Sequence, residues 1–150
     1  MYLLKATGAT YRKVIRQSKH AFPHQPKGEA DDRFVLLSKN KEDCTTTERQ
    51  IQHVAKILNV RDPHPGELDK AFSGVDASTR WRCVVDLYWG RPLVNPFNLS
   101  EVAGLNYKRY DTVQNFAALD HLDAVAVVKH LEETNPELLL EFVNEAERPS

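Results

Sequence analysis

The sequence predicts an α+β domain, a small mixed β-sheet or barrel with flanking helices. Two segments, residues 34–37 and 80–88, are rich in apolar, β-branched and aromatic residues and have the length of strands. A third segment, residues 120–131, carries apolar side chains at helical spacing. The 150 residues amount to one ordinary domain, so we expect a single domain over 1–150.

The first forty residues predict two strands and a basic helix. The apolar run at 2–5 is typical of a short strand, and residues 10–19 predict a helix rich in Lys and Arg. Two prolines and a glycine predict a loop over 20–32. The continuous apolar run at 34–37, bounded by polar residues on both sides, predicts a buried strand.

Residues 48–61 fit two periodicities. One set of apolar side chains, including Val54 and Leu58, recurs at helical spacing. Another set, including Ala55 and Ile57, alternates as in a strand. Periodicity leaves both structures open, and the proline-rich turn that follows ends the element in either case.

The second half of the chain alternates predicted strands, turns and helices. Residues 80–88 predict a strand, and the prolines after it favour a turn and then an edge or irregular segment, because proline cannot donate to a sheet. The other predicted elements are a helical turn at 67–72, a turn at 89–92, an edge segment at 93–96, a helix start at 98–101, a loop with a short strand at 107–116, a helix at 120–131 and a last helix at 136–147.

The formal net charge of −1 combines two unlike parts of the chain. Residues 1–28 carry six Lys and Arg and no acid, whereas residues 29–150 carry fourteen bases against twenty-one acids, a balance of −7. The charge distribution thus divides the domain into a basic N-terminal part at 1–28 and a remainder that ends in an acidic helix at 132–150. Such a dipolar molecule draws an anionic ligand toward its basic side.

Sequence motifs for catalysis are missing. No GxGxxG, GxxxxGK[ST], HExxH, GxSxG or CxxC motif occurs, so we expect no catalytic residues and no cofactor. His20 and His24 have the spacing of two metal ligands on one helix, but Pro23 lies between them, which favours exposed loop histidines and no metal site. Two cysteines are too few for a zinc cluster and fit a reducing compartment.

Binding is a better candidate than catalysis. The cations of the predicted basic helix lie close enough to form one stripe, although a solvated helix face has the same pattern. Aromatic residues also stand beside arginines in the second half of the chain, as base stacking requires, although core packing is the alternative for Trp81. These residues favour a module that binds an anion or a nucleic acid.

Short motifs that follow one another over residues 29–131 resemble the EVE domain of the PUA-like group, whose relatives include the YTH readers. The resemblance favours the strand over the helix for residues 50–58. The matching segments are GEADDRFVLLSKN at 28–40, QIQHVAKI at 50–57, DPHPGEL at 62–68, STRWRCVVDL at 78–87, RPL at 91–93 and FNLSEV at 97–102.

The resemblance implies a mixed barrel with flanking helices and a pocket that takes a flipped, modified base from DNA or RNA. It places Ser38 and Asn40 in the lining of that pocket. The family's tryptophan-containing segment after the first strand has no counterpart in residues 7–28, where Tyr11 or Phe22 would have to supply the pocket aromatic.

Together the residues and the resemblance predict a non-catalytic nucleic-acid-binding module, and the resemblance implies a reader of a modified base. The alternatives are a nucleic-acid- or nucleotide-processing enzyme on the same fold, which would use the histidines, and a protein-interaction module that docks through the acidic C-terminal helix. We expect a cytoplasmic protein, or a nuclear one in a eukaryote, with no membrane contact and with a partner effector protein for any downstream activity. The predicted base pocket consists of Ser38, Asn40, Trp89, Tyr110 and Trp81, and the predicted phosphate contacts are Lys5, Arg12, Lys13, Arg16 and Arg109.

Overall fold

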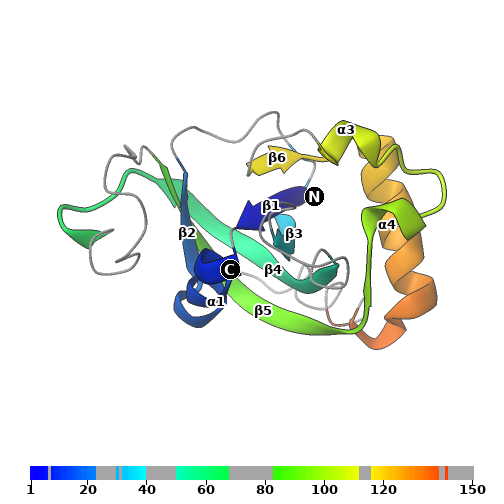
Figure 1. Ribbon diagram of the computed structural model, residues 1–150, viewed down its shortest axis with the longest axis horizontal. Coiled ribbons are helices and arrows are strands. Elements are labelled where there is room, and N and C mark those ends of the chain that lie inside the picture. The colour runs from blue at the N-terminus through cyan, green and yellow to red at the C-terminus, as the bar shows by residue number, and fades with distance from the viewer. Residues whose placement is uncertain are drawn as a thin grey trace.

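The computed structural model describes residues 1–6, 8–22, 30, 32–39, 50–67, 83–111, 116–138 and 141 (Figure 1). These residues form a six-stranded sheet in the order β2-β5-β4-β3-β1-β6, with helices beside it. The predicted α+β class is therefore confirmed. In chain order the elements are β1 (Tyr2–Ala6), α1 (Gly8–Gln17), β2 (Lys19–Phe22), β3 (Phe34–Lys39), β4 (Ile51–Arg61), β5 (Cys83–Phe97), the 3-10 helix η2 (Leu99–Glu101), α3 (Lys108–Asp111), β6 (Phe116–Ala118) and α4 (His121–Thr134).

The sheet is mixed because β1 runs parallel to β3, while the other pairings of the described strands are antiparallel. The chain between these two strands contains α1 and β2, which provide the crossover that a parallel pair needs. The carboxyl ends of β1 and β3 therefore lie at the same edge of the sheet, where Lys5 is the direct neighbour of Ser38.

Each face of the sheet is apolar and packs against a different helix. On one face, Tyr11 and Val14 of α1 join a buried cluster with residues of β1 to β5. On the opposite face, Val127 and Leu131 of α4 join a second buried cluster. Successive residues of β3 alternate between the two clusters, as the side-chain period of a strand requires. Figure 1 shows α1 and α4 on opposite sides of the sheet.

The sheet is curled but, over the described strands, is not closed into the barrel that the sequence predicted. The edge strands β2 and β6 approach each other through side chains, since the rings of Phe22 and Phe116 stack with centroids 4.9 Å apart and planes at 16°. Both rings belong to the buried cluster on the α1 face, so the two edge strands converge there through side chains and not through backbone pairing.

Most of the long predicted elements are confirmed. The strand at 34–37 corresponds to β3, the strand favoured by the resemblance corresponds to β4, and the helix predicted at 120–131 corresponds to α4, which begins one residue later. The turn after β4 contains Gly66 with φ of +75°, a left-handed conformation that favours glycine. Helical residues also follow Pro136, over 136–138.

Three predictions were wrong where tertiary pairing overrides local sequence. The predicted loop at 20–32 begins inside β2, which exists because it pairs antiparallel with β5. The predicted turn at 89–92 is part of one long strand, β5, which absorbs its prolines and Gly90 through shifts of register against β4. The edge segment predicted at 93–96 continues this strand, beyond the part that pairs with β2. The helix α3 replaces the first part of the loop predicted at 107–116.

None of the helices in the described part of the chain is both long enough and apolar enough to span a membrane.

Candidate nucleic-acid interface

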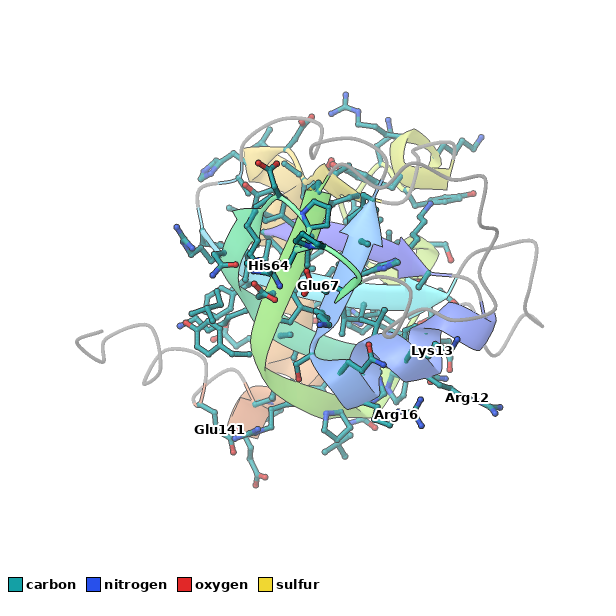
Figure 2. All side chains as sticks on the ribbon, turned by 90° about the vertical axis from the view of Figure 1, so that its left-hand side faces the viewer. Arg12, Lys13, Arg16, His64, Glu67 and Glu141 are labelled. Atoms are coloured by element: carbon teal, nitrogen blue, oxygen red, sulfur yellow. The ribbon has the colours of Figure 1, made fainter. Side chains whose placement is uncertain are left out.

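The outer face of α1 carries three cations, Arg12, Lys13 and Arg16. Arg12 and Arg16 are exposed and lie one helical turn apart, and Lys13 is half-buried beside them. Figure 2 shows all three side chains directed away from the sheet. Helix α1 has no acidic residue, and neither Arg12 nor Arg16 forms an ion pair or hydrogen bond within the described residues.

The sequence fixes which face of α1 points outward. Tyr11 and Val14 are buried against the sheet, so the residues between and after them must face solvent. The helix ends at Gln17, and the next residue, Ser18, has a φ of 55° and accepts through its carbonyl a hydrogen bond of 2.7 Å from the Leu87 amide of β5. The arginines are therefore presented on a helix that is anchored at its face and at its carboxyl end.

Two other cations, Arg61 and Lys19, are already neutralised by carboxylates. Arg61 binds Glu67 through Nη2 at 2.5 Å and Asp86 through Nε at 2.6 Å. Lys19 donates to the same Glu67 carboxylate at 3.0 Å, so residues of β2, β4, β5 and the turn after β4 form one ion network. Arg61 holds the pKa of Glu67 well below its usual range, mainly through their hydrogen bonds. We call these four residues the ion network.

The predicted residues Lys5 and Ser38 meet at the carboxyl ends of β1 and β3. They are direct neighbours in the parallel pair, and their side chains lie on the same face. Ser38 is buried and Lys5 is half-buried, with its ammonium donating to the backbone carbonyl of Tyr110. The structure thus brings together residues 33 positions apart in sequence, as a polar spot at the edge of an apolar sheet.

Tyr110 does not provide the stacking surface predicted from sequence. Its ring is 2% exposed within the cluster under α4, so no face is open to a base. Its hydroxyl donates to Asp123 and accepts from the Asp120 amide at 3.1 Å, and burial together with Asp123 raises its pKa. Tyr110 therefore joins α3 to the first turn of α4.

Arg109, predicted as a phosphate contact, forms an ion pair with Asp120. Both side chains are half exposed, and the pair lies next to the start of α4. This cation is therefore partly neutralised, in contrast to Arg12 and Arg16.

A tyrosine–histidine pair, not proposed as a site from the sequence, lies between α1 and β4. The Tyr11 hydroxyl and His53 Nδ1 are 2.7 Å apart, whereas the same hydroxyl is 3.5 Å from the Leu37 carbonyl. Burial raises the pKa of Tyr11 and lowers that of His53, so we assign Tyr11 as donor to a neutral histidine. No local sequence pattern could indicate this pair, because Tyr11 and His53 lie 42 positions apart in the chain.

His20 lies inside the fold rather than in an exposed loop, which corrects the sequence expectation. It is buried in β2, and its Nδ1 accepts a hydrogen bond of 2.9 Å from the Ala21 amide. Burial lowers its pKa to about 4, against a smaller opposite effect from a hydrogen bond to the Lys5 backbone. The described residues contain no cluster of three His, Cys, Asp or Glu that would hold a metal ion.

The side chains of three other predicted pocket residues lie outside the described part of the structure. The backbone of Trp89 belongs to β5, and its side chain lies outside the described part of the structure. Asn40 and Trp81 lie outside the described residues altogether, as does His24.

No protein-family profile matches the sequence, and no curated protein is similar to it in sequence. In structure, the chain is similar to the ASCH protein of Zymomonas mobilis, with a TM-score of 0.56 and 10% identity over 85% of this chain and 93% of that one. Two single-substitution variants of the same protein match at 10% identity with TM-scores of 0.57 and 0.55, over 86% and 85% of this chain and 94% and 96% of theirs.

At this identity the similarity establishes the fold alone. The fold is that of ASCH domains, which are PUA-like and related to EVE domains. The resemblance read from the sequence is therefore confirmed at the level of the PUA-like fold, while the matching structures belong to a sister family of EVE.

Proposed function

We propose that this chain is a nucleic-acid-binding module that holds the phosphate backbone of DNA or RNA on the outer face of α1. The observation that carries the proposal is the pair of exposed arginines, Arg12 and Arg16, on a helix without a single acid. Lys13 adds a third positive charge to the same helix. Phosphate backbones bind such cationic faces by releasing counterions, without the need for a deep cleft.

The charge distribution and the fold agree with this partner. Acids outnumber bases by seven over residues 29–150, whereas the segment that contains α1 is positively charged. This difference in charge orients an approaching polyanion toward α1. The PUA-like fold of the chain is consistent with a nucleic-acid partner. Catalysis plays no part in the proposal, and any cutting or signalling would come from an effector protein bound alongside.

We also propose that one base, modified or not, enters at the polar spot formed by Lys5 and Ser38. A flipped base costs a few kcal/mol of stacking, which edge hydrogen bonds and new stacking must offset. Ser38 and Lys5 offer hydrogen-bonding groups there, and Asn40, Trp81 and Trp89 would complete the pocket. This finer role rests on the EVE resemblance together with the observed neighbourhood of Lys5 and Ser38.

A charge-matched pair of double variants tests the backbone contact. We expect Arg12→Gln with Arg16→Gln to weaken oligonucleotide binding about tenfold near 0.1 M salt, and to reduce the slope of log K against log salt by about 1.5, because two phosphate contacts are lost. The control, Lys108→Gln with Lys129→Gln, removes the same charge from exposed positions on α3 and α4. Fluorescence anisotropy at several salt concentrations measures both quantities.

Equal loss in both double variants would show that net charge alone drives binding, and would overturn the role of α1. Absence of binding to any oligonucleotide would overturn the function. For the base pocket, Ser38→Ala should reduce the preference between methylated and unmodified oligonucleotides while it leaves the salt slope unchanged.

A further inference from the structure

Lys56 is a largely buried residue in the middle of the sheet, on the face that α4 covers. The residue as a whole is only 8% exposed, so its aliphatic stem is buried while the ammonium reaches solvent. The register places Lys56 opposite Phe34 of β3 and opposite Tyr88 of β5. Because residues directly opposite in antiparallel strands share a face, the three side chains form one row across three strands.

The two rings hold the ammonium but do not satisfy its hydrogen bonds. Lys56 Nζ lies 5.3 Å from the centroid of Phe34 and 5.6 Å from that of Tyr88, within range of cation–π attraction. Ring faces accept no conventional hydrogen bond, and Lys56 has neither an ion pair nor a hydrogen-bonded acceptor in the described part of the chain. The ammonium is not among the buried side-chain atoms without a partner in the described residues, so it reaches solvent and its three N–H groups can donate to the oxygens of a ligand.

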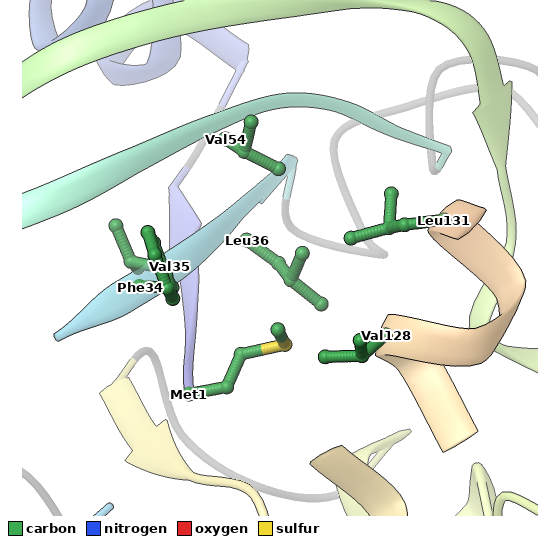
Figure 3. Close-up of a pocket in the computed structure, with 7 residues that line it drawn as sticks. All are labelled: Met1, Phe34, Val35, Leu36, Val54, Val128 and Leu131. Atoms are coloured by element: carbon green, nitrogen blue, oxygen red, sulfur yellow. The ribbon is translucent and has the colours of Figure 1, made fainter. Parts of the chain in front are cut away.

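An apolar cavity adjoins the row. Its volume is about 30 Å³, and Phe34 and Val54, which lie next to Lys56 in the sheet, contribute to its wall (Figure 3). Val128 and Leu131 of α4 close the opposite side, with Met1 and the neighbours of Phe34 in β3 making up the rest. A cavity of this size with a wholly apolar lining accepts a short hydrocarbon group and rejects a long chain or a bare ion.

We propose that Lys56, Phe34 and Tyr88 form a binding site for a small organic anion, one carboxylate or phosphate group attached to a short apolar end. The anionic oxygens accept hydrogen bonds from the Lys56 ammonium, and the apolar end enters the cavity beside Val54. The site lies on the α4 face of the sheet and is separate from the cationic face of α1. It therefore goes beyond the nucleic-acid binding proposed above and stands without it.

Propionate is the probe that matches this chemistry, and isothermal titration at constant ionic strength measures its binding. We expect millimolar binding by the wild-type protein, weaker binding of inorganic phosphate, and at least a tenfold loss in Lys56→Met. The matched control is Lys129→Met, which removes an exposed lysine from α4 and should bind propionate like the wild type.

A second measurement needs no variant that could misfold. In protein labelled with ¹⁵N-lysine, propionate should shift the Nζ resonance of Lys56 and leave that of Lys129 in place. A shift in neither resonance, or equal binding by wild type and Lys56→Met, would overturn the proposal.

The same variants decide where the anion comes from. If Lys56→Met loses oligonucleotide affinity and the wild type ignores propionate and phosphate, the anionic group belongs to a nucleic acid and the small-molecule proposal is wrong. If oligonucleotide affinity stays unchanged while propionate binding is lost, the site serves a free small molecule.

Discussion

The ion network and the cationic face of α1 use the same kinds of side chain in opposite ways. In the ion network, Arg61 binds the carboxylates of Glu67 and Asp86 and Lys19 also binds that of Glu67, at distances of 2.5 to 3.0 Å. On α1, Arg12 and Arg16 project into solvent without a carboxylate among the described residues. Figure 2 shows Glu67 over the sheet and both arginines beyond it on the helix.

The difference decides what each group of cations can do. A guanidinium that is already bound bidentately to carboxylates stabilises the fold and has few donors left for a ligand. An unpaired guanidinium contributes little to stability and keeps all its donors for a phosphate. Stability and binding should therefore respond to different arginines, and substitutions in the two regions test that separation.

The largest expected effect is on stability and comes from Arg61→Met. The substitution leaves two carboxylates without their main partner, and the side chains involved are only 11% to 25% exposed, so screening by water is incomplete. We expect a loss of about 2 kcal/mol in the free energy of unfolding. Denaturation at pH 7 measures it, and oligonucleotide affinity should stay within twofold of the wild type.

The pH dependence of that loss identifies its cause. Because Arg61 lowers the pKa of Glu67, the native carboxylate binds its proton less readily than the unfolded one, so its contribution is complete above the unfolded pKa of about 4.3. The contribution then disappears as the pH falls toward the lower native pKa. The difference between wild type and Arg61→Met should shrink below pH 4.5, and a constant difference would assign the loss to packing instead.

A smaller effect, on binding rather than on stability, is expected from Lys13→Glu. The new carboxylate lies three residues before Arg16 on the same helix and would pair with it, as Glu67 pairs with Arg61. This change makes α1 resemble the ion network. We expect about a tenfold loss of oligonucleotide affinity, equal to about 1.4 kcal/mol, with unfolding free energy changed by less than about 0.5 kcal/mol.

Lys108→Glu provides the control for charge reversal, because Lys108 is exposed on α3 and lies outside both regions. It should lower affinity less than threefold. A similar loss in both variants would mean that binding senses the total charge of the molecule and does not involve α1 specifically.

The parts of the fold that the sequence predicted are those with a strong local pattern. The continuous apolar run of β3 and the helical spacing in α4 each identify one element without reference to the rest of the chain. Strand β2 has no such pattern, since Lys19 and His20 interrupt its apolar residues, and it forms because β5 offers a partner strand. The stacking of Phe22 on Phe116 joins residues 94 positions apart, which no local pattern reveals.

The candidate site also has features that a local sequence pattern predicts and features that depend on tertiary contacts. The cations of α1 were predictable, because a helix without acids leaves its arginines unpaired within the helix. The burial of Tyr110 and the isolation of Lys56 depend on contacts made by α4 and by neighbouring strands, so sequence alone could not indicate them. The aromatic residues beside arginines predicted stacking on a base. In the structure, the ring of Tyr110 is buried in the core and has no face open to a base.

The smallest expected effect comes from a substitution of Lys19. It tests directly whether this cation belongs to the ion network or to the cationic face of α1. By sequence it belongs to the basic segment 1–28, but in the structure its ammonium donates to Glu67 and extends the ion network. Lys19→Met removes one outer pair of that network, and we expect a loss of about 0.5 kcal/mol in unfolding free energy, because the side chain is 25% exposed and Arg61 still holds Glu67. Oligonucleotide affinity and its salt slope should be those of the wild type. A fall in the salt slope by about 0.7 or more would show that Lys19 contacts a phosphate, and would place the boundary of the interface in β2 rather than at the end of α1.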